Sequence, residues 1–166
     1  MVYILIAAVI CGADQLLKHW IVTHLSLGSS TEFIPGVLGF THVRNTGMAF
    51  SLLSEHTWLL ALVSVAVIAV IAVLLFKAKF TTWEKIYLAL IMGGAAGNAI
   101  DRVFLGYVVD MFETLFVRFA VFNLADAFID VGAVLFCILY VTRTVREEKA
   151  KKAGEGERIE SDRDRQ

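Results

Sequence analysis

Four long apolar segments follow one another along the chain, separated by stretches in which glycine and polar residues gather. Residues 57–76 contain no charged side chain, and residues 2–22, 86–104 and 123–142 are similarly apolar but hold ionisable residues towards one end. About 20 apolar residues in a helix cross the hydrocarbon core of a bilayer. The pattern therefore predicts four transmembrane helices.

The connections between these segments differ in character. Residues 23–56 hold four glycines and the only proline, and the mixed run 36–43 carries a weak strand signal, so we expect a small platform that contains β-structure. The connection 105–122 is apolar for a loop, and we expect it to lie at the membrane interface.

The composition supports a membrane protein. Hydrophobic residues make up 58% of the 166 residues and charged residues 19%, with a mean hydropathy of +0.71, whereas soluble domains are about 45–50% apolar. Eight of the 15 basic and seven of the 16 acidic residues lie in 143–166. The nearly neutral body has no basic surface for nucleic acid. We expect one membrane-embedded domain over 1–152 and a charged cytoplasmic tail over 153–166 with a composition typical of disorder.

Lysine and arginine are unevenly shared between the connections. Eight of them lie within 77–85 and 143–152, against three within 23–56 and 102–122. Cytoplasmic loops carry an excess of basic residues, so we expect both termini in the cytoplasm. The predicted fold class is an all-α integral membrane protein of four transmembrane helices with a small extracytoplasmic β-containing platform.

With this orientation, ionisable residues of three segments converge on the outer leaflet. Asp14 and Lys18 lie in the outer half of the first segment, Asp101 and Arg102 at the outer end of the third, and Asp126 at the outer start of the fourth. Ionisable groups inside a membrane are costly and usually face a bundle interior or a wet cavity. Their convergence predicts a functional site.

Histidine, cysteine and serine patterns do not indicate a metal, a cofactor or a nucleophile. The four histidines lack the one-turn spacing with which two histidines share zinc, and each of the two cysteines stands alone in an apolar run. We therefore expect no metal and no cofactor. Ser64 has no titratable partner in its segment, and pairing of Ser51 with Lys18 has little support.

Carboxylates are the abundant reactive groups in this part of the chain. They are Asp14, Asp101, Asp110, Asp126 and Asp130. Two carboxylates held close together share one proton, so that one acts as a general base on water while the protonated partner polarises the attacked carbonyl. This arrangement is typical of aspartic peptidases.

Two other function classes stay open on the pattern alone. A small transporter would relay ions through intramembrane acids, but it predicts a polar pathway to both leaflets, and the inner halves of the segments hold almost nothing polar. A non-catalytic assembly factor predicts tolerance of Asp→Asn changes.

Five short motifs occur in order between residues 14 and 126. They are Asp14-Gln15 followed by Lys18, Asn45-Thr46-Gly47-Met48-Ala49-Phe50, Gly93-Gly94-Ala95-Ala96-Gly97-Asn98-Ala99-Ile100-Asp101-Arg102, Val108-Val109-Asp110, and Phe122-Asn123-Leu124-Ala125-Asp126. In this set and order the chain resembles lipoprotein signal peptidase, the bacterial signal peptidase II. Length and topology match from about residue 1 to 145.

The resemblance implies a four-span enzyme of the bacterial inner membrane, with its active site towards the outer leaflet and no metal. Such enzymes cleave the signal peptide of a diacylglyceryl-modified prolipoprotein just before the lipidated cysteine. The expected partners are therefore this substrate, membrane lipid and the cyclic peptide inhibitor globomycin, and not nucleic acid.

The resemblance also implies that Asp110 and Asp126 form the catalytic pair. Asp101 competes with Asp110, because both lie at the outer side and periodicity does not choose between them. Arg102 is expected to donate hydrogen bonds to substrate carbonyls. Asp130 departs from the family pattern one turn beyond Asp126, and we expect Asp130→Asn to leave activity largely intact.

Neighbouring residues are expected to bind substrate or to support the pair. Asn45, in the same motif as Gly47, and Asn123 each offer a donor and an acceptor to a peptide backbone. Asn98 is expected to cap or crosslink helices near the aspartates. The i, i+4 spacing of Asp14 and Lys18 permits an ion pair within one helix, and the spacing of Gly93 and Gly97 predicts close helix packing.

Overall fold

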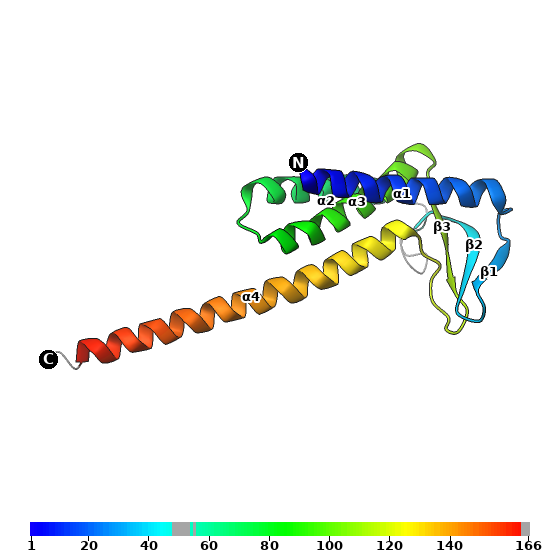
Figure 1. Cartoon of the computed structure of the whole chain (residues 1–166). Coiled ribbons are helices and arrows are strands. Elements are labelled where there is room, and N and C mark those ends of the chain that lie inside the picture. Colours follow the sequence, from blue (N-terminus) through cyan, green and yellow to red (C-terminus); the bar gives the residue numbers. More distant parts are fainter. Residues whose placement is uncertain (48–53, 55, 164–166) are drawn as a thin grey trace.

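The computed structural model describes residues 1–47, 54 and 56–163. Over these residues the chain forms four helices and three strands, in the order α1 (Val2–His24), β1 (Ser30–Ile34), β2 (Leu38–Asn45), α2 (Thr57–Lys77), α3 (Thr82–Phe104), β3 (Val108–Thr114) and α4 (Leu124–Arg163). Figure 1 shows the helices side by side, the strands at the end of the bundle away from the N-terminus, and α4 running far beyond the other helices.

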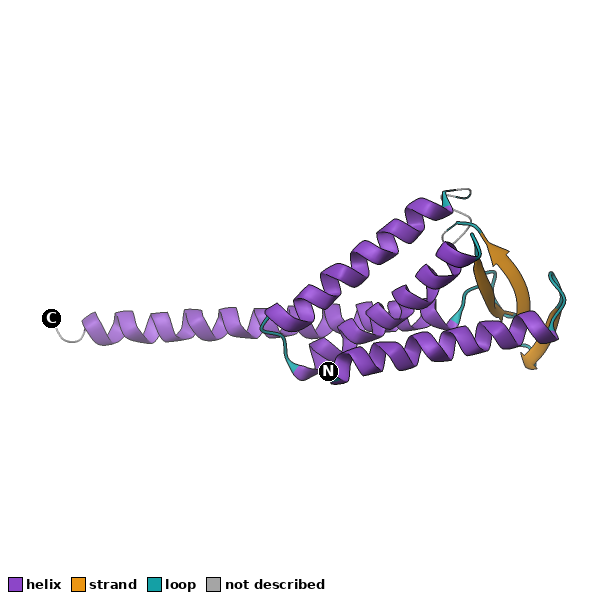
Figure 2. Cartoon of the chain, turned by 90° about the horizontal axis from the view of Figure 1, so that it is seen from above, coloured by secondary structure: helices purple, strands orange, loops and turns teal. Residues whose placement is uncertain are grey.

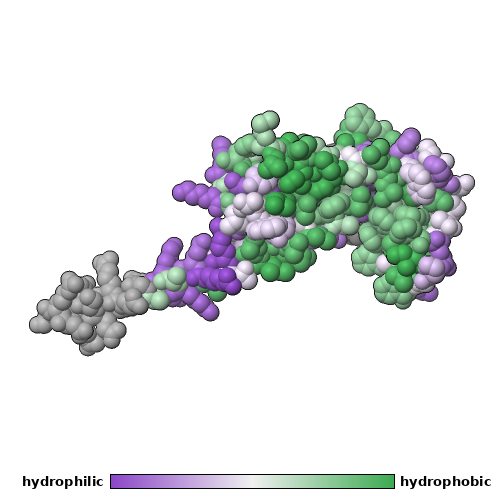
Figure 3. Space-filling view, viewed as in Figure 1, coloured by the Kyte–Doolittle hydropathy of each residue, from purple (hydrophilic) through white to green (hydrophobic). Residues whose placement is uncertain are grey.

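Three of the described helices are long and apolar enough to cross a membrane: α1, α2 and the part of α4 from Leu124 to Ala153. This confirms three of the four expected spans. The fourth, α3, has 23 residues, but its glycines and the polar residues near its end lower its hydropathy. Apolar side chains cover most of the helical body, and hydrophilic ones gather on the part of α4 outside it (Figure 3).

Local capping and composition explain where α3 and α4 differ from the expected spans. Helix α3 begins at Thr82, before the expected start, because Thr81 and Glu84 form a reciprocal capping box. Helix α4 continues to Arg163 instead of ending near 142. The residues immediately after 142 are rich in Arg, Glu, Lys and Ala, which favour helix and extend α4 into the charged region.

Small residues bring α3 close to α1 and α4. A Cβ at Gly93 would lie 2.7 Å from the carbonyl oxygen of Ala7 in α1, and one at Gly94 would overlap the carbonyl oxygen of Ala125 in α4. The expected packing role of this glycine motif is therefore confirmed. Away from the sheet, α1, α2 and α3 share an apolar core around Ala7 and Met92.

The strands form one antiparallel sheet in the order β1-β2-β3. The β1–β2 hairpin turns at Pro35-Gly36, where Gly36 has a φ of +69° and Val37 N–H donates to the Ile34 carbonyl over 2.9 Å. This is the geometry of a type II turn. The β-containing platform is confirmed, but the sequence missed that the 105–122 connection supplies its third strand.

Helix α2 diverges from α1 towards the sheet end, as Figure 2 shows. The shared core around Ala7, Ile71 and Leu75 lies at the opposite end of the two helices. Polar side chains gather between α2, α3, α4 and the sheet at this diverging end.

Candidate active site

Asp110 and Asp126 reach the sheet end of the bundle from different elements. Asp110 lies within β3, and Asp126 lies in the first turn of α4. Asn45 at the end of β2, Asn98 in α3 and Asn123 just before α4 surround them. The tertiary fold thus gathers two carboxylates and three amides from four separate segments.

Asn123 caps α4 and joins the two carboxylates. Its Oδ1 accepts from the Asp126 backbone N–H at 2.9 Å, and its own backbone N–H donates to Asp126 Oδ2 at 3.2 Å. These reciprocal bonds form a capping box that holds Asp126 against the start of the helix. The Asn123 Nδ2 donates to Asp110 Oδ1 at 2.7 Å. One buried amide therefore sets the positions of both acids.

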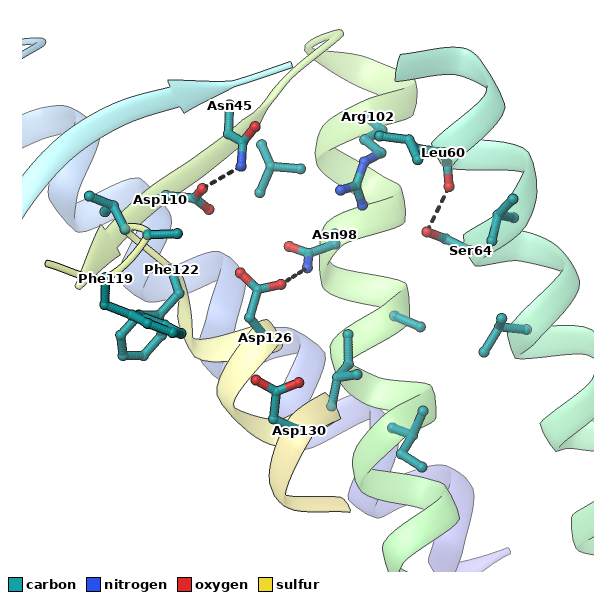
Figure 4. Close-up of a pocket in the computed structure, with 18 residues that line it drawn as sticks. Asn45, Leu60, Ser64, Asn98, Arg102, Asp110, Phe119, Phe122, Asp126 and Asp130 are labelled. Atoms are coloured by element: carbon teal, nitrogen blue, oxygen red, sulfur yellow. Dashed lines mark hydrogen bonds between the residues drawn. The ribbon is translucent and has the colours of Figure 1, made fainter. Parts of the chain in front are cut away.

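The Asp110 carboxylate is buried and its charge is only partly compensated. Asn45 Nδ2 donates to its second oxygen at 2.8 Å (Figure 4). Burial is the main cause that raises the pKa of Asp110 to about 6; the nearby charge of Asp126 contributes to the rise, and the amide bonds from Asn45 and Asn123 oppose it. Asp110 therefore keeps its proton to a higher pH than an ordinary aspartic acid does.

Asn98 connects the pair to a second group of charges. Its Nδ2 donates to Asp126 Oδ1 at 2.7 Å, and its Oδ1 accepts from Asn123 Nδ2 at 3.1 Å and from Lys18 Nζ at 2.9 Å. Its amide is thus bonded on both sides, and it crosslinks α1, α3 and α4 as expected for a helix-joining residue.

A buried ion cluster of Asp14, Lys18 and Asp101 lies beside the pair. Lys18 Nζ lies 2.9 Å from Asp14 and 3.0 Å from Asp101, which confirms the expected i, i+4 ion pair and adds a second acid to it. The other oxygen of Asp14 accepts from the Ala125 backbone N–H, and the Asp101 oxygen that faces Lys18 also accepts from the Val109 backbone N–H. The cluster thereby ties α1, α3, α4 and β3 together, with one ammonium shared by two carboxylates.

Gln15 is a polar residue of this region whose role the sequence analysis did not predict. Its Nε2 donates to Asp101 Oδ1 at 2.8 Å and to the Gly97 carbonyl at 3.1 Å. A polar amide inside an apolar transmembrane segment needs a hydrogen-bond partner. The position of Gln15 in the first apolar segment could therefore have predicted a structural role.

A pocket of about 390 Å³ opens beside the two carboxylates. Helices α2 and α4 form its sides and α3 its back, with Asn45 and Asp110 at the sheet end (Figure 4). Its lining is mainly apolar, with Ser64, Arg102 and Asp130 among its polar members. A few polar groups in an apolar pocket are typical of a ligand site.

Arg102 extends from α3 at the sheet end of this pocket (Figure 4). Its Nη2 donates to the Gly47 carbonyl at 3.4 Å, and its buried Nε has no hydrogen-bond partner in the described residues. Gly47 N–H in turn donates to Asn45 Oδ1 at 2.9 Å. Arg102 therefore has an N–H group near the carboxylates that is free to donate a hydrogen bond to a ligand.

Some of the sequence-level candidates lie outside the described residues. They are Ser51 and the Met48-Ala49-Phe50 end of the second motif. Among the residues that are described, no three His, Cys, Asp or Glu side chains are grouped so that they could hold a metal ion.

Comparison with known proteins places this arrangement in a family. Residues 6–142 match the family model described as "Signal peptidase (SPase) II". The lipoprotein signal peptidase of Enterococcus faecalis is 44% identical over 155 residues, covering 93% of this chain and 94% of that protein. That of Lactobacillus gasseri is 42% identical over 142 residues, covering 85% and 92%.

Solved structures agree with the sequence relatives. A bacterial membrane enzyme solved at 2.3 Å by the in meso method superposes with a TM-score of 0.81 and 32% identity, covering 86% of this chain and 89% of that one. A second, solved at 1.9 Å, gives a TM-score of 0.76 at 32% identity over 84% and 92%. The chain therefore belongs to the signal peptidase II family of membrane-embedded peptidases.

Proposed function

We propose that the protein is an aspartic endopeptidase that removes signal peptides from diacylglyceryl-modified prolipoproteins by cleaving before the lipidated cysteine. One observation carries the proposal: Asp110 and Asp126 border one pocket, are joined through the Asn123 amide, and form no ion pair within the described residues. Uncompensated acids at such a site favour a shared proton over two full charges.

The reaction that this pair supports uses water as the nucleophile. The ionised carboxylate takes a proton from water as the oxygen forms a bond to the scissile carbonyl carbon. The protonated carboxylate donates to the carbonyl oxygen and stabilises the charge that develops there. Collapse of the tetrahedral intermediate breaks the C–N bond, and a carboxyl group of the pair delivers the proton that the leaving amine needs. The pair then shares one proton again.

The surrounding amides position the acids in this proposal, in place of the expected contact with the peptide backbone. Both functional groups of Asn45 are engaged within the protein, by Asp110 and by Gly47 N–H. The Asn123 amide likewise bonds Asp110, Asn98 and the α4 backbone. Arg102 keeps its expected role as a donor to substrate carbonyls.

The pocket also supports a lateral route for a lipid-anchored substrate. Leu60, Val63 and Val67 of α2 line it, and α2 diverges from α1 at this end of the bundle (Figure 2). We propose that the sheet end lies at the outer leaflet of the bacterial inner membrane with both termini in the cytoplasm. Lys77 and Arg143 at the opposite end support this orientation. The diacylglyceryl group would then hold the scissile bond at a fixed depth.

The test is cleavage of a purified diacylglyceryl-modified prolipoprotein by the purified protein in EDTA, with the product identified by mass spectrometry. We expect the lipidated cysteine as the new N-terminus, slower cleavage of an equally well-inserted substrate without the lipid, and inhibition by globomycin. Absence of cleavage, or a requirement for metal, would overturn the proposal.

A further inference from the structure

Asp130 is a pocket residue that the proposed mechanism does not use. It follows Asp126 by one turn of α4 and lies on the same face of the helix (Figure 4). Its side chain is exposed, and it lines the same pocket as Asp110 and Asp126. Asp126 accepts hydrogen bonds from Asn98 and Asn123, whereas Asp130 forms no hydrogen bond or ion pair within the described residues. Its acceptor positions are therefore open to a ligand.

The pocket around Asp130 is otherwise apolar. Val67, Ile91 and Ile129, which lie farther from the sheet along their helices, line this part of it. In such surroundings a hydrogen bond to a carboxylate is stronger than in water. A bound substrate removes water from the Asp130 carboxylate. If the substrate supplies no hydrogen-bond donor in its place, the charge stays unpaired and binding is weaker.

The spacing along α4 relates Asp130 to a position in the substrate. Four residues of helix advance about 6 Å along the axis, and an extended peptide covers this distance in about two residues. A signal peptide keeps its basic N-terminus in the cytoplasm, so the residues before the cleaved bond lie deeper in the pocket than the bond itself. Asp130 also lies deeper than Asp126 in the proposed orientation.

We infer that Asp130 determines specificity by selecting prolipoproteins with a hydrogen-bond-donating side chain, such as that of threonine or serine, about two residues before the cleaved bond. The inference rests on the proposed function and assigns Asp130 a contact with substrate and no part in bond cleavage. The carboxylate accepts from the substrate hydroxyl, and an aliphatic side chain of the same shape leaves it unpaired.

Matched substrates separate this role from a structural one. Two diacylglyceryl-modified prolipoproteins would differ only by threonine or valine two residues before the cleaved bond, since these side chains are nearly isosteric. A second pair would carry the exchange one residue farther upstream. We expect the wild type to favour threonine by roughly tenfold in kcat/KM at one of the two positions. Asp130→Asn should reduce the preference, and Asp130→Leu should abolish or reverse it while valine substrates are still cut.

Glu147→Gln is the matched control, because Glu147 is a largely exposed carboxylate on α4 outside the pocket. It should keep the wild-type preference. Equal cleavage of both members of both pairs by the wild type, or a preference that survives Asp130→Leu, would overturn the inference while the proposed function stands. Failure of the wild type to cut any of the four substrates would overturn both.

Discussion

The buried ion cluster and the Asp110–Asp126 pair hold the same kind of side chain at the same end of the bundle, yet their surroundings differ. Asp101 and Asp110 are equally buried, each 2% exposed. Asp101 lies 3.0 Å from the Lys18 ammonium, whereas among the described side chains only the amides of Asn45 and Asn123 donate to Asp110. The pair also borders a pocket that neither acid of the cluster lines. Burial alone therefore does not identify a reactive carboxylate.

The difference shows how one region supports the other. The ion pairs and hydrogen bonds of the cluster hold α1, α3, α4 and β3 together. Lys18 also donates to Asn98, which donates to Asp126. Asp110 and Asp126 form no ion pair in the described part of the chain, and burial favours the protonated form of Asp110 at a cost in stability. The cluster thus serves to position the acids that we propose to be reactive.

Replacing single aspartates by asparagine is the most direct test of the difference between the pair and the ion cluster. We expect Asp110→Asn and Asp126→Asn each to lower kcat for prolipoprotein cleavage by about 10²–10⁴-fold, because each removes a proton donor or acceptor of the reaction. Asp101→Asn should keep measurable activity. Thermal melting in detergent would check that each variant is folded. Full activity in both pair variants would refute the assignment.

Removing the cation tests the ion cluster. Lys18→Met leaves Asp14 and Asp101 without their shared partner, so we expect the free energy of unfolding to fall by about 3–5 kcal/mol. The measurement is denaturant unfolding in a fixed detergent. Adding Asp101→Asn to Lys18→Met should restore part of the loss, because one buried charge is then removed. If the single variant is as stable as the wild type, the cluster does not support the fold.

Close packing beside the cluster offers a smaller perturbation. A Cβ at Gly97 would lie 2.5 Å from Asp14 Oδ2, whereas a Cβ at Gly12 would meet no atom within 4 Å. We expect Gly97→Ala to lower the free energy of unfolding by about 1–3 kcal/mol through this overlap. Gly12→Ala, measured in the same way, should be neutral or slightly stabilising because alanine favours helix. Equal effects would show that the Asp14 contact is unimportant.

The pH dependence of activity tests the protonation of the Asp110–Asp126 pair. Because burial raises the pKa of Asp110 to about 6, the pair loses its shared proton as the pH rises through this value. We therefore expect kcat/KM to fall on the alkaline side of about pH 6. Asn45→Ala removes a donor to the ionised form of Asp110, so the apparent pKa should rise and activity should persist to higher pH.

A pH–rate profile of wild type and Asn45→Ala would measure this shift. Ser30→Ala is a control, because Ser30 bonds Glu113 elsewhere on the sheet. A downward shift in Asn45→Ala, or an equal shift in Ser30→Ala, would contradict the assigned cause.

The two capping boxes show what a local sequence motif can and cannot predict. Thr81 with Glu84 and Asn123 with Asp126 have the same spacing and the same reciprocal bonds. Glu84 lies at the far end of the bundle, where Arg143 approaches it to 3.1 Å, while Asp126 faces the pocket. The motif predicts a helix start in both places, but not which acid is left without a cation.

Strand β3 marks a similar limit. Its residues were expected to form an apolar loop, because a short apolar run carries no period that separates strand from loop. Pairing with β2 makes it a strand, through partners such as Val43 opposite Asp110. That pairing also carries Asp110 to the pocket.

The sequence by itself determined the apolar helices, the turn at Pro35-Gly36, the close packing at Gly93 and the family motifs. These depend on hydrophobic length, backbone preference and residue order, which are local properties. Only the tertiary structure decided that Lys18 forms an ion pair with Asp101, and that Asp130 shares the pocket with Asp126. Charge compensation and access depend on distances between segments far apart in the chain, and folding alone sets those distances.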